Sequence, residues 1–355
     1  MVTPLVVHGN ALDLAACGIA DGSVDLIVTS PPYFGLRSYQ DGGEHYAGQI
    51  GAEATPAEFV DALVAATAEM VRVLKPSGSI FVNLGDKYAT SGTRQGNRGN
   101  TDGLSVRETA KHYMGTPKGY RDKSLMGMPW RYALRCIDDL GLILRAEIVW
   151  SKPNGLPESV TDRVRRSHET WFHFTKAPRY YANVDEVREP HLAPTRTAGM
   201  NAMQARNASA PRTAVGGYSG PNPLGKLPGS VWSIPTQPLR LPEHLGVQHF
   251  AAFPMEWPRR FIKAWCPPDG VVLDPFGGTG TTATVAHALG RHGITVDLSH
   301  DYCRVAQWRT TDPGQLAKAR QAPKPRPVVV TTGEGDVEVP PGEPTLLDLI
   351  EGDAA

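Results

Sequence analysis

The stretch Val271-Val272-Leu273-Asp274-Pro275-Phe276-Gly277-Gly278-Thr279-Gly280-Thr281-Thr282 places a glycine-rich turn directly after a short apolar run. The valines and the leucine predict a buried strand over residues 271–274, and a helix follows through Ala283 to Leu289. Glycines let the backbone approach a ligand closely, and the first turn of a helix leaves N–H groups without partners. This order predicts a ligand site at the carboxyl end of a parallel sheet.

The next predicted strand, Gly293 to Asp297, ends in an acid that can accept hydrogen bonds from two ribose hydroxyls. Gly278-x-Gly280-x-x-Ala283 also satisfies the loose dinucleotide pattern, so a nicotinamide cofactor is one hypothesis at this point. A tight strand-to-helix turn without any ligand is another. The strand, the turn, the helix and the distal acid together favour a nucleotide-like cofactor.

Strands and helices also alternate in the first half of the chain. Val24 to Thr29 is an apolar, β-rich run, and Thr55-Pro56-Ala57-Glu58 has the pattern of a capping box that begins a helix. Ser79 to Leu84 is the next predicted strand. Strand, helix and strand in succession are typical of a parallel sheet. We therefore predict an α/β fold with a Rossmann-like, mostly parallel sheet flanked by helices.

The tetrapeptide Ser30-Pro31-Pro32-Tyr33 directly follows the first of these strands. A proline-terminated strand with a surface tyrosine is the simplest interpretation of so short a pattern. However, proline lacks an N–H and has a fixed φ, so two prolines make a rigid turn with outward-facing carbonyl acceptors. With the Ser30 hydroxyl and the Tyr33 ring beside them, such acceptors suit an NH₂ group on a flat base.

Composition limits the classes of protein to consider. The 355 residues are 41% hydrophobic, with 36 Lys and Arg against 36 Asp and Glu, and no run of 18 apolar residues occurs. We predict no membrane span and a cytoplasmic protein of a bacterial or phage-infected cell. The four cysteines form no C-x-x-C pair, which argues against a structural zinc site, and we predict no metal.

Charge is distributed unevenly. Residues 1–333 carry 36 cations against 29 acids, a net +7, because the last 22 residues contain seven acids and neither Lys nor Arg. Residues 86–125 and 186–247 are basic and rich in glycine or proline, as expected of functional loops or of an insertion. A basic globular part permits a polyanionic partner.

Taken together, the two turns resemble those of the DNA amino-methyltransferases, which methylate the exocyclic amine of adenine or cytosine. The family's D/N/S-P-P-Y/F/W motif is similar to Ser30 to Tyr33, and its D-P-F-x-G-S/T-G-T-T motif is similar to Asp274 to Thr282. The catalytic motif comes first here, as in the beta class. Further similar blocks are Gly9 to Leu12, Arg72 to Gly78, Glu147 to Asn154, His168 to Phe172 and His249 to Pro254.

The resemblance implies a class I methyltransferase fold in circularly permuted order, S-adenosyl-L-methionine as cofactor and double-stranded DNA as partner. A homodimer and a cognate restriction endonuclease are further partners that it allows. It implies catalytic roles for Ser30, Pro31, Pro32 and Tyr33. The cofactor-binding residues would be Asn10, Phe253, Pro254, Asp274, Phe276, Gly277, Gly278, Gly280, Thr281, Thr282 and Asp297. Arg163, Arg165, Arg166, Arg196, Arg206 and Arg212 would contact DNA. Asn10 stands where the family usually has an acid.

Residues 1–185 are then the catalytic half of the methyltransferase domain and 248–311 its cofactor-binding half. A target-recognition insertion over 186–247 lies between them, and 312–355 would be a disordered acidic tail. Two alternatives are an RNA or protein amide N-methyltransferase and a catalytically silent DNA-binding relative. The serine before Pro-Pro favours cytosine N4 over adenine N6 as the target, since serine is commoner there in the N4 enzymes of the family.

Overall fold

The computed structural model describes residues 4–35, 40–41, 44–45, 49–89, 120–191, 222–239, 241–247, 252–321, 328–332 and 335–339. The chain divides into two compact units, one formed by residues 1–183 and 229–321 and the other by 184–228 and 322–355. The two turns of interest both lie in the first unit, which is built around one large sheet.

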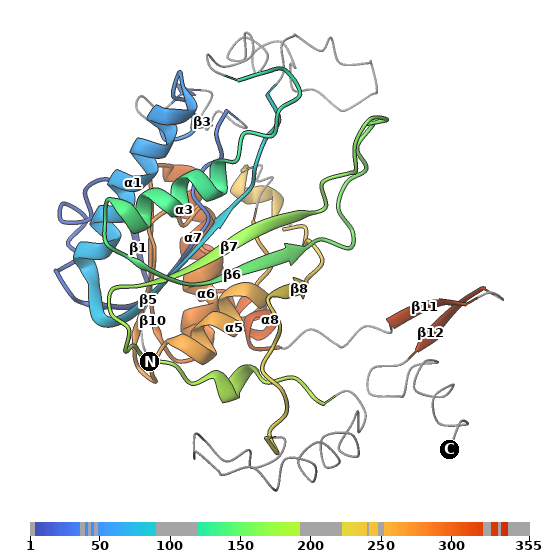
Figure 1. Cartoon of the computed structure of the whole chain (residues 1–355). Coiled ribbons are helices and arrows are strands. Elements are labelled where there is room, and N and C mark those ends of the chain that lie inside the picture. The colour runs from blue at the N-terminus through green and yellow to red at the C-terminus, as the bar shows by residue number, and fades with distance from the viewer. Residues whose placement is uncertain are drawn as a thin grey trace, which may run out of the picture. The chain divides into compact units, whose positions relative to one another are not determined.

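This sheet has eight strands in the order β1-β10-β9-β2-β5-β7-β6-β8 among the described residues (Figure 1). The first five in that order are mutually parallel, β7 is antiparallel to both neighbours, and β8 is parallel to β6. The predicted α/β fold with a mostly parallel sheet is therefore confirmed. The strands are β1 (Leu5–His8), β2 (Val24–Thr29), β5 (Leu74–Leu84), β6 (Ile143–Ser151), β7 (His168–Thr175), β8 (Val231–Ser233), β9 (Val271–Asp274) and β10 (His292–Asp297).

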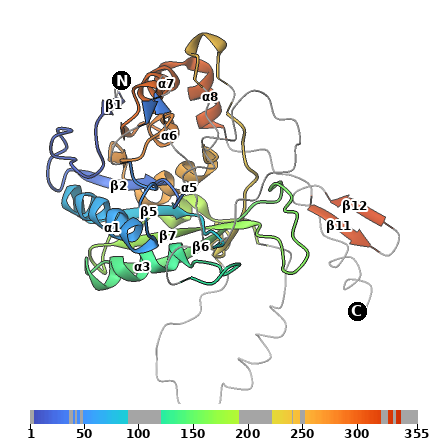
Figure 2. The ribbon, with the colours of Figure 1, turned by 90° about the horizontal axis from the view of Figure 1, so that it is seen from above.

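Helices cover both faces of the sheet (Figure 2). The core on one face contains α1 and α3, and the core on the other contains α5, α6 and α8. Successive side chains of a strand point to opposite faces of the sheet and so enter different cores. In β2, Ile27 belongs to the core that contains α1, and its neighbours Leu26 and Val28 belong to the core that contains α5. The helices are α1 (Pro56–Val73), α3 (Met128–Asp138), α5 (Glu256–Trp265), α6 (Thr281–Ala288), α7 (His300–Thr311) and α8 (Pro313–Arg320).

Local sequence explains where α1 begins. The Thr55 side chain accepts from the Glu58 N–H at 3.2 Å, and the Glu58 carboxylate accepts from the Thr55 N–H at 2.9 Å, so the predicted capping box is present. The strand after it begins earlier than predicted, at Leu74, which pairs with Val24 across a register shift. The short elements of this unit are β3 (Gln40–Asp41), β4 (Glu44–His45) and the 3₁₀ helix Glu243–Leu245.

Two boundaries of the sequence-based division need correction. The insertion expected over 186–247 is shorter, because Val231 pairs with Val149 and residues 229–247 join the first unit. The tail expected to be disordered over 312–355 contains α8, which the Asp312 side chain caps by accepting from the Gln315 N–H at 2.8 Å. Proline and charged residues concealed this helix, which is held by the buried Ala319.

The second unit contains the 3₁₀ helix Val184–Val187 and an antiparallel bridge between Glu189 and Lys226. It also contains the antiparallel pair β11 (Val328–Thr332) and β12 (Gly335–Val339), another departure from the expected disordered tail. None of the helices in the described ranges has the length and apolar character of a membrane span.

Candidate active site

The site lies at the carboxyl ends of two neighbouring strands whose following helices pack on opposite faces of the sheet. Helix α6 connects β9 to β10 on one face, whereas α1 connects β2 to β5 on the other, and β9 and β2 are neighbours. Such a switch point leaves a crevice outside the carboxyl ends of the two strands. The glycine turn, residues 275–280, follows β9, and the S-P-P-Y turn, residues 30–33, follows β2. Two motifs that lie far apart in sequence are thus adjacent in space.

Asp274 forms hydrogen bonds with residues of, or next to, both turns. Its carboxylate accepts from the Thr29 hydroxyl at 2.6 Å, from the Phe276 N–H at 3.2 Å and from the Thr282 hydroxyl at 2.9 Å. The side chain is buried, and burial raises the pKa of this carboxyl to about 7. Its visible role is structural, and contact with a cofactor stays a prediction.

The glycine turn packs too tightly for side chains. A Cβ on Gly277 would overlap Thr295 Oγ1 and lie 2.8 Å from Thr295 Cβ. A Cβ on Gly280 would lie 2.8 Å from Ala306 Cβ, and this residue also has φ +75°. Gly278 has φ +51°. The turn therefore presents backbone without side chains at Gly277, Gly278 and Gly280. Thr281 and Thr282 at the start of α6 are buried, and the Thr282 hydroxyl lies within hydrogen-bond distance of Asp274 and of the Val28 carbonyl. Their contact with a cofactor stays a prediction.

A buried cation supports this turn. Arg309 on α7 donates to the Thr279 carbonyl at 3.1 Å, and to the hydroxyls of Thr279 at 2.8 Å and Thr281 at 2.9 Å. No carboxylate partner for it occurs among the residues that the structure describes. Burial lowers its pKa to about 10. Sequence reasoning missed this residue, since one arginine in a helix carries no signal of its own.

Asp297 ends β10 as predicted, beside the glycine turn. One carboxylate oxygen accepts from the Gly278 N–H at 2.7 Å and the other from the Ser299 N–H at 2.8 Å. The contact of Asp297 with ribose hydroxyls stays a prediction. Asn10 lies after the neighbouring β1, where its side chain accepts from the Leu12 N–H at 3.0 Å and shapes the loop locally.

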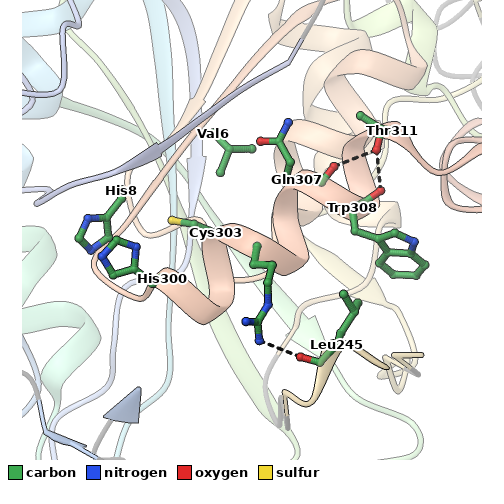
Figure 3. A pocket seen from close by; sticks show the side chains of 9 residues that line it. Val6, His8, Leu245, His300, Cys303, Gln307, Trp308 and Thr311 are labelled. Atoms are coloured by element: carbon green, nitrogen blue, oxygen red, sulfur yellow. Dashed lines mark hydrogen bonds between the residues drawn. The ribbon is translucent and has the colours of Figure 1, made fainter. Parts of the chain in front are cut away.

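A pocket lies between β1 and α7, beside the end of β10 (Figure 3). The His8 and His300 rings stack there with centroids 3.5 Å apart, and His8 Nε2 lies 2.9 Å from the Leu298 carbonyl oxygen. His8 pairs in register with Asp297. The two flat rings therefore border the region of the predicted ribose site, and sequence reasoning did not identify them.

Phe253 and Pro254 lie elsewhere along the sheet. The Phe253 ring meets the Trp171 ring of β7 edge-on with centroids 5.6 Å apart, and Pro254 is buried where the chain enters α5. The described contacts of these two residues do not include the glycine turn. Their part in cofactor binding stays a prediction.

The S-P-P-Y turn is held by a polar side chain at the carboxyl end of β5. Asn83 Oδ1 accepts from the Ser30 hydroxyl at 3.3 Å and from the Tyr33 hydroxyl at 2.7 Å. Its amide nitrogen donates to the Thr170 carbonyl at 3.2 Å, which orients the amide. The single hydroxyl hydrogen of Ser30 is thus used by Asn83, and the oxygen can act towards a ligand only as an acceptor.

Tyr33 also contacts a second strand. Its hydroxyl lies 2.9 Å from Glu169 Oε2 on β7, and Glu169 forms an ion pair with Lys152 at the end of β6. The Tyr33 ring packs on Gly85, where a Cβ would lie only 2.6 Å from Tyr33 Cε2. The signal for Asn83 and Glu169 in the sequence was a polar residue within or beside an apolar strand.

The structure describes three of the six arginines predicted to bind DNA, and their surroundings differ. Arg165 is exposed, whereas Arg163 pairs with Glu158 at 2.7 Å and Arg166 lies 3.8 Å from Asp86 Oδ2. The other three arginines of that prediction, Arg196, Arg206 and Arg212, lie outside the described residues. The described residues include no group of three side chains suited to a metal ion.

A mostly parallel sheet with a glycine turn and an acid on the next strand suits a nucleotide-like cofactor, as in the class I methyltransferase fold, and the S-P-P-Y turn beside it favours amine methylation over the nicotinamide hypothesis. The DNA methylase family matches residues 24–308. The chain is 34% identical to the Type II methyltransferase M.SmaI of Serratia marcescens, over 86% of this chain and 89% of that protein. It is 37% identical to M.XycI of Xanthomonas campestris pv. cyanopsidis, over 84% and 85%.

Solved structures agree with the fold. The PvuII DNA methyltransferase, named as cytosine-N4-specific, superposes with a TM-score of 0.57 at 20% identity, over 88% of this chain and 89% of that one. A Thermus thermophilus protein complexed with S-adenosyl-L-methionine has a TM-score of 0.50 at 21% identity, over 97% and 100%. The chain belongs to the DNA methylase family of N6 and N4 amino-methyltransferases. It is a site-specific DNA methyltransferase with S-adenosyl-L-methionine as cofactor, which confirms the predicted resemblance, activity and cofactor.

Proposed function

We propose that the amine methylated by this enzyme is N4 of cytosine. The observation that supports this most directly is the neutral hydrogen-bonding pair of Ser30 and Asn83. A hydroxyl whose hydrogen is taken by Asn83 accepts an N–H without adding a negative charge to the pocket. Serine before Pro-Pro is also the residue that the resemblance associates with cytosine N4. Adenine N6 is the competing target, because a hydroxyl can hold either amine.

The residues of the S-P-P-Y turn would orient the amine. An exocyclic amine is a poor nucleophile because its lone pair is delocalised into the ring. Hydrogen bonds from its two N–H groups to Ser30 Oγ and the Pro31 carbonyl favour a pyramidal nitrogen with a directed lone pair. Asn83 cannot take up a proton at neutral pH, so this network orients the amine and the surplus proton leaves to solvent. Alignment of this kind can supply roughly 7–11 kcal/mol of rate enhancement.

S-adenosyl-L-methionine supplies an electrophilic methyl group when bound. The chain fits it at the glycine turn, where the space that a Cβ on Gly277 or Gly280 would need is already filled by the protein, so bare backbone faces the crevice. Asp297 would hold the ribose through its carboxylate, at the end of the strand that follows the glycine turn. Phe276 would contact the cofactor from the same turn, and Asn10 from the neighbouring loop. These assignments extend the sequence-based roles and are tested by binding measurements on single variants.

The partner we propose is double-stranded DNA, with the target base turned out of the helix. Extruding a base costs a few kcal/mol, and stacking on the Tyr33 ring would return about 1–3 kcal/mol. Residues 186–228, the part of the predicted insertion outside the first unit, would choose the DNA sequence. Exchanging them for the matching region of a relative should change the methylated sequence and leave cofactor affinity intact.

The partners beyond DNA follow from the relatives. Because these are named Type II methyltransferases, we propose a cognate restriction endonuclease and hence a protective role in a restriction-modification system. A homodimer would be tested by analytical ultracentrifugation of the free enzyme. A single sedimenting species with the mass of one chain would contradict the dimer without affecting the proposed chemistry.

The target atom is tested by product analysis. DNA methylated by the purified enzyme is digested to nucleosides and separated by mass spectrometry. We expect N4-methyl-2′-deoxycytidine, and N6-methyl-2′-deoxyadenosine alone would overturn the cytosine assignment. Ser30→Ala and Tyr33→Ala should each lower turnover far more than cofactor affinity, because both residues face the target base in this proposal.

A further inference from the structure

The hairpin between β6 and β7, residues 152–167, carries two apolar side chains that are almost fully exposed. Leu156 is 88% exposed and Val164 is 86% exposed, whereas no other large hydrophobic side chain among the described residues is more than 63% exposed. The hairpin extends past the ends of both strands (Figure 1). Side chains so placed cost solvation free energy without contributing to the core, which favours a role in binding.

Leu156 and Val164 lie on the two facing segments of the hairpin, which hydrogen bonds hold together. Arg165 donates to the Gly155 carbonyl at 3.1 Å, which places the residue before Leu156 against the residue after Val164. At the base, the Lys152 N–H donates to the Ser167 carbonyl at 2.9 Å. Asn154 and Thr236 exchange two hydrogen bonds at 3.1 and 2.8 Å. These hydrogen bonds hold the hairpin in a defined conformation.

Charge on the hairpin fits a polyanion. It carries four cations, Lys152, Arg163, Arg165 and Arg166, and two acids. Both acids are paired, Glu158 with Arg163 at 2.7 Å and Asp162 with Lys123 at 2.6 Å. Arg163 also lies over the Tyr88 ring at 3.8 Å. Lys152 and Arg166 also face acids outside the hairpin, Glu169 and Asp86. Arg165 is exposed and forms no ion pair with the described residues, so it is the cation placed to meet a phosphate, beside the exposed apolar groups that suit stacked bases.

The base of the hairpin leads directly to the catalytic turn. Lys152 forms an ion pair with Glu169, which lies 2.9 Å from the Tyr33 hydroxyl. Because β7 is antiparallel to β5, its first residues lie at the same edge of the sheet as the S-P-P-Y turn. A duplex that delivers a base to Tyr33 therefore has to pass close to this hairpin.

We propose that the hairpin is a wedge, which inserts Leu156, supported by Val164, into the duplex beside the extruded base while Arg165 contacts a phosphate. Apolar side chains inserted at a base step unstack it and compensate part of the cost of deforming the helix. The occupant is duplex DNA, and the inference rests on DNA methylation by this enzyme but not on which base is methylated. The wedge acts on base extrusion and takes no part in methyl transfer itself.

The test compares paired and unpaired targets. The recognition sequence is first located by sequencing DNA from cells that express the protein. Two synthetic duplexes with that sequence are then methylated, one fully paired and one with an abasic site opposite the target base. Leu156→Ala should lower kcat/KM about tenfold on the paired duplex and less than threefold on the other, because an unpaired base is already easy to extrude.

Leu134→Ala is the matched control, since Leu134 is a 51% exposed leucine on α3. It should leave both rates unchanged. The double variant Leu156→Ala, Val164→Ala covers the case in which either side chain alone suffices. Unchanged rates for the double variant, or equal losses on the two duplexes, would overturn the wedge. A wild-type enzyme that methylates neither duplex would contradict the enzymatic activity instead.

Discussion

Gly277→Ala should damage the cofactor site through a steric conflict with one named neighbour. The new Cβ would overlap Thr295 Oγ1 and lie 2.8 Å from Thr295 Cβ, whereas carbon atoms pack at about 3.5–4.0 Å. The turn or β10 must therefore move by about 1 Å. Overpacking of this size costs about 1–3 kcal/mol in the free energy of unfolding. Because the turn forms the cofactor site, S-adenosyl-L-methionine affinity should fall at least tenfold, about 1.4 kcal/mol.

Urea unfolding measures the stability of each variant, and isothermal titration calorimetry measures cofactor affinity. Gly229→Ala is the control, because a Cβ there meets nothing within 4 Å and its φ is ordinary. It should change neither quantity.

A double-mutant cycle with Thr295→Gly isolates the conflict, since this change removes the two Thr295 side-chain atoms and leaves only the Asp274 carbonyl oxygen, at 3.3 Å, among the three nearest neighbours of the new Cβ. Glycine in a strand costs about 0.5–1 kcal/mol by itself. If the conflict is the cause, the double variant should recover at least about 1 kcal/mol relative to the sum of the single costs. Strictly additive costs, or a Gly277→Ala protein with wild-type stability and affinity, would refute the reasoning.

Three further predictions concern neighbouring residues. Asp297→Ala should weaken S-adenosyl-L-methionine binding at least tenfold, about 1.4 kcal/mol, and unchanged calorimetric affinity would contradict its role at the ribose. Folding raises the pKa of Asp274 from 3.8 to about 7, so its favourable contribution is complete below about pH 4 and is lost as the pH rises through 7. Asp274→Asn should therefore gain stability relative to wild type between pH 5 and pH 8, as measured by urea unfolding at about four pH values across that range, and a constant difference would exclude this titration. Glu169→Ala should lower kcat about tenfold or more with cofactor affinity intact, whereas Glu169→Gln should lose less because its amide can still form a hydrogen bond with the Tyr33 hydroxyl. Equal kinetics for the two Glu169 variants and wild type would show that the contact does not position the tyrosine.

Local patterns in the chain were sufficient for most of the elements around the site. The capping box at Thr55, the apolar run before Ser30 and the glycine turn after Asp274 are each decided by residues within a few positions of one another. For that reason the strand, turn and helix order, and with it the parallel sheet, could be predicted. Helices α5 and α8 could not, because proline and charged residues mask a periodicity that only burial against β2 and α6 reveals.

What the sequence by itself determined was the two motifs, their order and the class of chemistry that they permit, since turn geometry and cofactor recognition depend on short-range residue types. Tertiary structure alone decided which side chains meet. Asn83 reaches Ser30 and Tyr33 across 53 and 50 positions, and Glu169 reaches Tyr33 across 136. Such contacts depend on strand order and register, which are set by the packing of two cores on opposite faces of one sheet.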